Sequence, residues 1–255
     1  MKVIGLIPAH LASVRFPRKI LFPFHDVPMI EHVRRRALMA EGLDEVYVAT
    51  CDEEIATTVA SSGGNVIMTA KTHQNGTNRC AEAAEALSCT HILLLQGDEP
   101  LLLPRHISAM IAAMRANPEG DAWNATAPIN EASELDRHSF VKCALGIHGR
   151  INFCFRRSPS IASFEAQQTA IRKILGMIGF RRDYLITIAA EPATTFEKLE
   201  SIEQMRIVET GGFLTSVPVD ESLPSVNEPA EAQQVLDYVQ HSEEQANLLR
   251  RVLAW

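Results

Sequence analysis

The chain has no run of about 18 uninterrupted apolar residues, so its sequence predicts no membrane span. The apolar stretch near its N-terminus is short and is interrupted by Pro8, which argues against a signal peptide. The five cysteines are odd in number, scattered and without a CxxC pair. This pattern favours reduced thiols over a disulfide framework or a zinc site, and we therefore expect a cytoplasmic protein.

The chain also has no excess or runs of basic residues. Lys and Arg number 24 against 31 Asp and Glu, and the net charge is −7, so we expect no nucleic-acid partner. The glycine fingerprints GxGxxG and GxxxxGK[ST] are both missing, which excludes a Rossmann turn or a P-loop. An acidic protein without these fingerprints can hold an anionic substrate only if its cations gather locally.

The first half of the chain alternates short apolar runs with segments whose apolar residues recur at helical spacing. The run HILLL at 91–95 is apolar on both faces, as in a strand that is covered on both sides. This alternation predicts an α/β fold with a mostly parallel sheet and helices on both faces. The expected strands are 3–7, 46–49, 66–68 and 91–95, and the expected helices are 28–40, 53–61, 78–87 and 104–115.

The second half is less regular. No Gly/Ser-rich linker divides the chain, so we expect a single domain over 1–255, with an inserted β-rich lobe at about 130–215. Residues 161–169 have little apolar periodicity and are expected to form a loop or arm. The expected strands are 123–129, 141–147, 151–155, 174–180 and 213–219, and the expected helices are 196–209, 229–239 and 242–254.

The first candidate site is the segment LIPAHLASVRFPRKIL, residues 6–21. The apolar strand ends in the small residues of 9–13, and Arg15 and Lys19 follow close together with Arg18 beside them. Small residues let the backbone approach an anion, and fixed cations offset its charge. The segment therefore predicts a phosphate-binding loop, and the alternative is a surface loop that carries three positive charges.

The second candidate site is QGDEP, residues 96–100, directly after the expected strand 91–95. Ligands bind outside the carboxyl ends of strands in an open parallel sheet. The carboxylates of Asp98 and Glu99 at such an end suit a Mg²⁺ that keeps several waters and contacts substrate phosphates. A polar turn is the alternative, but the neighbouring cation loop favours a magnesium site.

The third candidate site is HQNGTNR, residues 73–79, just before an expected helix. Its polar side chains and Gly76 are suited to a binding loop, whereas a plain turn capped by Thr77 or Asn78 explains the same residues. The nine histidines are dispersed, and we expect His73 to be structural rather than a catalytic base.

Together the three loops resemble the CMP-sugar synthetases that activate 3-deoxy-manno-octulosonate (Kdo). LIPAHLASVRFPRKIL is similar to the family's PAR-x-x-S-x-R-L-P-G-K-P-L, HQNGTNR to its HQSGTER, and QGDEP is unchanged. PMIEHV, GGNVIMT and IEQMR are close to its PMI-x-H-V, GG-x-V-x-MT and LEQLR. The motifs keep the family's order from residue 3 to about residue 235, so the chain is identified as a divergent member.

The resemblance implies a nucleotidyltransferase fold with a sheet-like arm that makes a homodimer. It implies transfer of CMP from CTP to the anomeric hydroxyl of an acidic 2-keto sugar, release of pyrophosphate, Mg²⁺ as cofactor, and a role in lipopolysaccharide or surface polysaccharide synthesis. The matching residues are Ser13, Arg15 and Lys19 for the triphosphate, Ala9, Gln96, Asn75, Gly76 and Arg79 for cytidine, Asp98 for the metal, and Lys142, Arg157, Glu203 and Gln204 for the sugar.

The chemistry of nucleotidyl transfer agrees with this assignment. The reaction needs charge neutralised on the leaving pyrophosphate and a nucleophile held in line. Arg15, Lys19 and one magnesium ion are therefore expected to neutralise this charge, and Asp98 is the third expected catalytic residue. We expect a second magnesium ion, held by Asp98, to lower the pKa of the sugar hydroxyl and so to replace a general base.

The chain departs from the family pattern at three positions around the nucleotide. His10 replaces the Arg of PAR and remains an expected nucleotide-binding residue. Arg18 replaces a loop glycine and offers a replacement for the lost charge. Asn227 replaces the Asp that is the second metal ligand, and its neutral amide oxygen is expected to bind Mg²⁺ more weakly.

Near the sugar, Ile174, Ile178 and Phe180 replace a His and two Tyr of the family. Burying unpaired polar groups of a substrate is costly, so we expect an acceptor other than unmodified Kdo. The alternatives are a non-catalytic nucleotide-binding paralogue and an enzyme for another sugar. A sugar 1-phosphate nucleotidyltransferase is disfavoured because a GxGTR loop is missing, and a glycosyltransferase because no Asp-x-Asp follows the strand.

Overall fold

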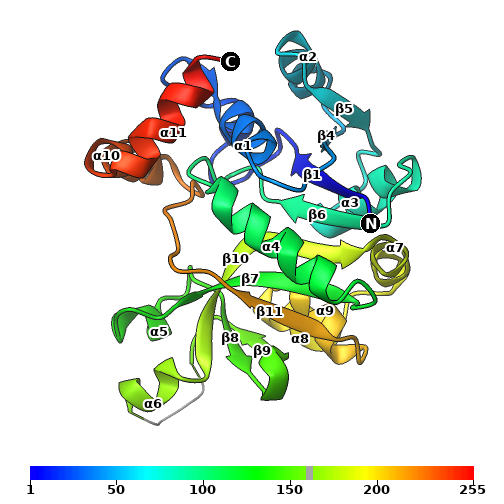
Figure 1. Cartoon of the computed structure of the whole chain (residues 1–255), viewed down its shortest axis with the longest axis vertical. Helices are drawn as coiled ribbons and strands as arrows, with labels where there is room; N and C mark the ends of the chain where they lie inside the picture. Colours follow the sequence, from blue (N-terminus) through cyan, green and yellow to red (C-terminus); the bar gives the residue numbers. More distant parts are fainter. Residues whose placement is uncertain (159–162) are drawn as a thin grey trace.

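The computed structural model of the chain describes residues 1–158 and 163–255 (Figure 1). Within them, nine strands form one sheet and two short strands form a separate hairpin. In chain order the strands are β1 (Val3–Ala9), β2 (Pro23–Phe24), β3 (Val27–Pro28), β4 (Glu45–Thr50), β5 (Asn65–Met68), β6 (His91–Leu95), β7 (Ala122–Pro128), β8 (Lys142–Leu145), β9 (Ile151–Phe155), β10 (Ile171–Arg181) and β11 (Leu214–Pro218).

Helices connect most of these strands. In the described part of the chain, none of them is both long and apolar enough to cross a bilayer. They are α1 (Met29–Leu38), α2 (Glu53–Ser61), α3 (Gly76–Glu85), α4 (Pro104–Ala116), α5 (Ser133–Asp136), α6 (Phe164–Gln168), α7 (Arg182–Ala190), α8 (Thr195–Glu200), α9 (Gln204–Glu209), α10 (Pro229–His241) and α11 (Glu243–Leu253), with 3₁₀ turns η1 (Lys19–Leu21) and η2 (Ile147–Gly149).

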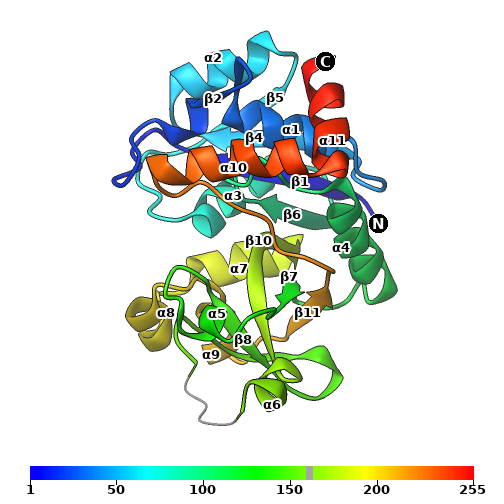
Figure 2. The same ribbon diagram turned by 90° about the vertical axis from the view of Figure 1, so that its left-hand side faces the viewer.

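The main sheet has the order β11-β7-β10-β6-β1-β4-β5. Strand β1 is parallel to β4 and β6, and β4 is parallel to β5. Strand β10 runs antiparallel to β6 and β7, and β7 is parallel to β11. All strands of this path except β10 therefore point in one direction. The carboxyl ends of β1 and β6 therefore lie at the same edge of the sheet, as Figures 1 and 2 show.

The sheet is covered on both faces because its strands alternate their side chains between two apolar clusters. Val3 and Ile7 of β1 pack in the cluster that includes α1, α4 and α10, whereas Ile4 and Leu6 pack in the cluster that includes α3, α7 and α9. The predicted α/β class, with a mostly parallel sheet between helical layers, is confirmed.

The expected elements of the first half are confirmed with small shifts at their ends. The helix 53–61 and the strand 91–95 have the expected bounds. Gly63 follows α2 with a φ of +71°, the left-handed conformation in which glycine commonly ends a helix. The short hairpin of β2 and β3 was not expected, and it turns at His25 and Asp26, which both have positive φ.

The single helix expected at 196–209 is wrong, because the structure breaks it into α8 and α9. Ser201 has a φ of +54°, a left-handed conformation that ends α8. Ahead of α8, Thr194 and Glu197 form a capping box. The apolar spacing continues across the break, which explains why periodicity alone does not reveal it.

The loop or arm expected at 161–169 is partly wrong. Residues 161 and 162 lie outside the described residues, and α6 occupies Phe164–Gln168. The side chain of Ser163 accepts a hydrogen bond from the backbone N–H of Ala166 and caps this helix. A capping serine was thus the available signal for an element that has little apolar periodicity.

The inserted lobe expected at about 130–215 includes β8 and β9, which extend from β10 as a hairpin. It also includes β10, which runs through the main sheet between β6 and β7. Strand β10 spans 171–181, longer than the expected 174–180, and its pairing with β7 shifts register between Ile174 and Ile178. Helix α7, which follows β10 directly, was not expected.

Candidate functional site

The loop after β1 folds as a compact turn that presents the predicted cations. The backbone N–H groups of Ser13 and Arg18 donate to the carbonyl of Leu11 at 2.9 and 3.1 Å. Arg18 has a φ of +61°, the left-handed conformation that favours glycine, and the family pattern has a glycine at this position. Its guanidinium forms an ion pair with Glu54 on α2, so its charge is balanced by that helix rather than directed at the site.

The centre of the site is an ion pair between the loop after β1 and the loop after β6. The Nζ atom of Lys19 lies 2.6 Å from Oδ2 of Asp98 and donates to the carbonyl of Val226 at 3.2 Å. The two side chains are only 13% and 25% exposed, so water screens this pair less than a surface pair. The ends of β1 and β6 thus converge on one place, as the sequence predicts.

Arg15 and Asn227 lie at the open side of this ion pair. Arg15 donates from Nη2 to Oδ1 of Asn227 at 3.3 Å, and its side chain remains 61% exposed. Asn227 is held by its backbone N–H, which donates to the carboxylate of Glu231 at 2.6 Å. The amide oxygen of Asn227 therefore faces a cation, while its neighbour Val226 contacts Lys19.

Two glycines allow the three candidate loops to touch. A Cβ atom on Gly76 would lie 3.1 Å from Cγ of Pro8 and 3.7 Å from Nε2 of Gln96. A Cβ atom on Gly97 would lie 3.0 Å from a methyl of Ile20 and 3.3 Å from the carbonyl of Pro8. The close approach of the three backbones at this edge of the sheet therefore depends on the absence of side chains there.

The predicted base-binding residues differ in what they offer to a ligand. Ala9 is buried at the end of β1. Asn75 caps α3, because its Oδ1 accepts the N–H of Asn78 at 2.8 Å. Arg79 is 3% exposed and donates to Oγ1 of Thr69 at 2.6 Å, so its guanidinium is directed into the protein.

His10 occupies the mouth of the site at the end of β1. Partial burial and the neighbouring charge of Arg79 both lower its pKa below the usual range. The imidazole is therefore neutral at pH 7, so it does not supply the permanent charge of the arginine that it replaces.

A small cavity between α3, α7, α9 and β10 brings together two of the predicted sugar residues. Glu203 accepts hydrogen bonds from the backbone N–H and the hydroxyl of Thr77, at 3.1 and 2.5 Å. Gln204 donates to Oδ1 of Asn124 on β7 at 3.0 Å. The cavity is mostly apolar, and it is lined by Thr77, Ile178, Phe180, Ile188, Glu203, Gln204, Arg206 and Ile207.

The other two predicted sugar residues do not line this cavity. The side chain of Lys142 is buried, and its ammonium donates to the carbonyls of Arg137, Phe140 and Arg156. Burial lowers the pKa of Lys142 to about 8. Arg157 is exposed at the end of β9. In this conformation Lys142 holds the lobe together rather than facing a ligand.

Glu99 links the loop after β6 to strand β10, a contact that its position in QGDEP does not reveal. Its Oε1 accepts the backbone N–H of Gly176 at 3.0 Å, which joins the loop after β6 to the irregular segment of β10. A Cβ atom on Gly176 would lie 2.4 Å from this oxygen. Burial, and secondarily the charge of Asp98, raises the pKa of Glu99 to about 7.

The donors at the site fit a magnesium ion that arrives with a nucleotide. Asp98 and Asn227 offer hard oxygen atoms, and Mg²⁺ usually takes one or two such ligands together with phosphates and water. Among the described residues, no three His, Cys, Asp or Glu side chains gather into a metal cage.

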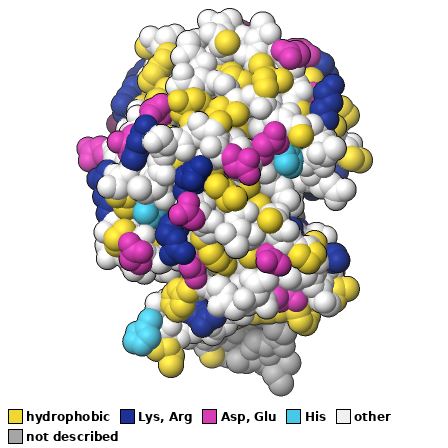
Figure 3. Space-filling model, turned by 90° about the vertical axis from the view of Figure 1, so that its right-hand side faces the viewer, with side chains coloured by type: hydrophobic (Ala, Val, Ile, Leu, Met, Phe, Trp, Pro, Cys, Tyr) yellow, Lys and Arg dark blue, Asp and Glu magenta, His cyan; other side chains and the backbone are white. Residues whose placement is uncertain are grey.

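Figure 3 shows the surface hollowed at one edge, between the larger and the smaller part of the molecule.

Comparison with known proteins identifies the family. The sequence profile of the cytidylyltransferase family matches residues 4–219. The 3-deoxy-manno-octulosonate cytidylyltransferase of Geobacter sulfurreducens is 33% identical over 93% of this chain and 99% of its own length. The 8-amino-3,8-dideoxy-manno-octulosonate cytidylyltransferase of Shewanella amazonensis is 36% identical over 83% of this chain and 87% of its own length.

A solved structure agrees in both fold and sequence. The structure of a CMP:2-keto-3-deoxy-manno-octonic acid synthetase in complex with CTP superposes with a TM-score of 0.88, at 32% identity, over 94% of this chain and 99% of that one. The fold is therefore that of the nucleotidyltransferases. The chain belongs to the cytidylyltransferase family, as a divergent member of its CMP-Kdo synthetase group.

Proposed function

We propose that the protein transfers CMP from CTP to the anomeric hydroxyl of a 2-keto-3-deoxy sugar acid and releases pyrophosphate. The observation that supports this most directly is the meeting of Lys19 and Asp98 at the ends of β1 and β6, 2.6 Å apart. A triphosphate needs cations and a metal-binding carboxylate in one place, and this edge of the sheet brings both together. The CTP in the related solved structure supports the choice of nucleotide.

The residues of the site have separate roles in the proposed reaction. Lys19 and Arg15 bind the phosphates and offset the charge that grows on the leaving pyrophosphate. Asp98 and Asn227 would hold the magnesium ion, which would polarise the triphosphate and lower the pKa of a nearby hydroxyl. The two loops that carry Gly76 and Gln96 enclose the base, and the missing side chain of Gly76 lets them approach each other closely.

The acceptor is Kdo or a variant of it, and of these we favour a modified form, such as the 8-amino acid for which the Shewanella relative is named. Ile178 and Phe180 give the cavity beside Glu203 an apolar wall where the family has hydroxyl-bearing side chains. Such a wall leaves fewer partners for sugar hydroxyls, whereas the carboxylate of Glu203 is a partner for a cation.

A panel of acceptors tests this proposal. Pyrophosphate release from CTP and Mg²⁺ is measured with Kdo, with its 8-amino form and with shorter 2-keto-3-deoxy acids, and we expect preference for a modified acid. A clear preference for unmodified Kdo would reject the substrate hypothesis alone. No turnover with any acid, despite tight CTP binding, would instead favour a non-catalytic paralogue, for which His10 and Asn227 are the supporting residues.

The Asn227→Asp variant tests the metal assignment. The added carboxylate supplies a charged oxygen next to Asp98, so we expect the magnesium concentration for half-maximal activity to fall about tenfold. The measurement is a Mg²⁺ titration of pyrophosphate release at saturating CTP. Asn247→Asp, an exposed change on α11, is the control for net charge and leaves the titration unchanged. An unchanged or raised requirement in Asn227→Asp removes Asn227 from the metal site.

A further inference from the structure

The segment that brings Asn227 to the site has neither helix nor strand. It runs from β11 to α10 over residues 219–228, and we call it the strap. The N–H of Val219 donates to the carbonyl of Thr126 at 2.8 Å, and the N–H of Val226 donates to the carbonyl of Asp98 at 3.0 Å. The backbone of the strap is thus tied to the sheet at one end and to the metal-binding loop at the other.

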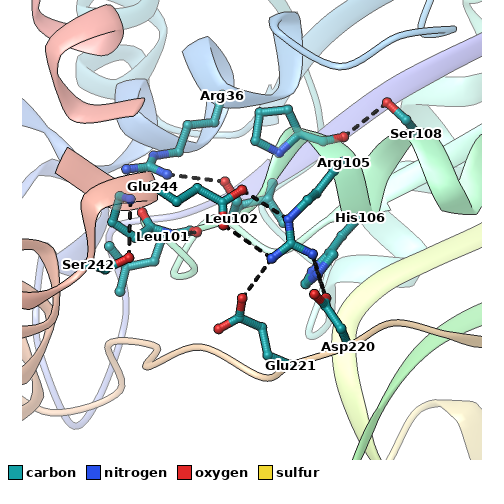
Figure 4. A network of polar contacts seen from close by, with 12 residues as sticks. Arg36, Leu101, Leu102, Arg105, His106, Ser108, Asp220, Glu221, Ser242 and Glu244 are labelled. Carbon is teal, nitrogen blue, oxygen red and sulfur yellow. Dashed lines mark hydrogen bonds and ion pairs between the residues drawn. The ribbon is translucent and has the colours of Figure 1, made fainter. Parts of the chain in front are cut away.

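Between these two ends the strap is held by side chains, chiefly by Arg105 on the first turn of α4 (Figure 4). The guanidinium of Arg105 pairs with Asp220 through Nη1 and with Glu221 through Nη2, the latter at 2.7 Å. His106, the next residue of α4, contacts Asp220 at 2.6 Å. Hydrogen bonding to Arg105, and secondarily to His106, lowers the pKa of Asp220 to about 2, so both partners stay charged near neutral pH.

Arg105 has a third partner outside the strap. Its Nε lies 2.9 Å from Glu244 on α11, so one guanidinium joins α4, the strap and the C-terminal helix. Figure 4 shows three carboxylates converging on it, two from the strap and one from α11. The side chain of Arg105 is 40% exposed, and isolated ion pairs at such a surface contribute little to global stability. The effect of this network is therefore expected in the local position of the strap rather than in the stability of the fold.

The strap is short enough for this anchor to matter at the site. Asn227 follows Glu221 by six positions, which span about 20 Å at full extension. Leu223 and Pro224, between them, line a small cavity together with Glu99. Beyond this cavity, the carbonyl of Val226 accepts from Lys19, and Oδ1 of Asn227 accepts from Arg15. A displacement of the strap at Asp220 and Glu221 therefore reaches groups that contact both phosphate-binding cations.

We propose that Arg105 is a positioning residue for the nucleotide site, which holds the strap so that Val226 and Asn227 meet Lys19, Asp98 and Arg15. Arg105 does not touch the reacting groups, and it acts through the strap. The inference rests on the proposed function only for its kinetic readout, because the position of the strap can be measured in the absence of any substrate.

The first experiment is hydrogen exchange of the whole protein without ligands. In Arg105→Met, we expect the amide of Val226, which donates to the carbonyl of Asp98, to exchange about fivefold faster than in the natural protein, while amides of β1 and β6 keep their rates. The double variant Asp220→Asn/Glu221→Gln removes the two strap charges that pair with Arg105 and is expected to behave alike. Glu244→Gln removes only the link to α11 and is the matched control, with strap exchange unchanged.

The second experiment is the Mg²⁺ titration of CTP turnover with the same variants. We expect the Mg²⁺ concentration for half-maximal activity to rise about fivefold in Arg105→Met and in the strap double variant, while the melting temperature stays the same. Arg105→Lys should recover at least part of this change. Uniformly faster exchange, or an equal effect of Glu244→Gln, would show that Arg105 only stabilises the fold and would overturn the proposal. An inactive natural protein would contradict the proposed function but leave the exchange result decisive for the strap.

Discussion

Replacing Asp98 with Ala is expected to lower CTP turnover by about 100-fold to 1,000-fold while the protein stays folded. The carboxylate is the charged oxygen that fits magnesium at the site, and it lies 2.6 Å from the Lys19 ammonium. Without it, the metal loses its charged protein ligand, and the phosphates lose the ion that holds them against Lys19. The measurement is kcat and KM for pyrophosphate release across a range of Mg²⁺ concentrations.

The stability of this variant separates catalysis from folding. The Lys19–Asp98 pair is partly buried, so its loss should lower the free energy of unfolding by about 1–3 kcal/mol, less than the loss of a fully buried pair. Asp183→Asn removes a carboxylate that is 84% exposed on α7 and is the matched control, with unchanged turnover. Retained turnover in Asp98→Ala would remove Asp98 from the metal site.

Replacing Glu31 with Gln is expected to lower the free energy of unfolding by about 3–5 kcal/mol, the largest effect on stability that we predict. Glu31 on α1 is fully buried, and it accepts from Arg34 at 2.7 Å and from Arg35 at 2.9 Å. The same arginines donate to the carbonyls of Ser62 and Val252, so the carboxylate anchors α1 to the end of α2 and to α11. Loss of its charge leaves two buried cations without a counter-charge. Denaturant unfolding measures the change.

An exposed ion pair provides the contrast for Glu31. Lys2 and Glu45 lie 2.6 Å apart, but their side chains are 43% and 36% exposed. Glu45→Gln should therefore change the free energy of unfolding by less than about 1 kcal/mol. Equal effects of the two substitutions would contradict the view that the buried carboxylate is essential to the packing of α1.

The sequence predicted the sheet and the meeting of the first two candidate loops for a clear physical reason. Apolar runs that alternate with helical segments produce parallel strands, and the carboxyl ends of parallel strands share one edge. Lys19 and Asp98, 79 positions apart in the chain, therefore had to approach each other once β1 and β6 became neighbours. Local chemistry and topology were sufficient for this part of the site.

Other features depended on contacts that no local pattern encodes. The family resemblance places Lys142 near the sugar, and the structure adds that its ammonium donates to three carbonyls of its own lobe. Arg105 lies 115 positions from Asp220, and neither residue belongs to a motif. The left-handed Ser201 divides a continuous apolar pattern into α8 and α9. In each case the deciding interaction is tertiary, so it could be recognised only in the structure.

A crystal structure of the protein with CTP and Mg²⁺ tests the central proposal most directly. We predict that the triphosphate lies against Lys19 and Arg15, that the metal is bound to Asp98, and that the Lys19–Asp98 contact of 2.6 Å opens to admit them. A nucleotide bound elsewhere on the molecule, with this ion pair still closed, would contradict the account.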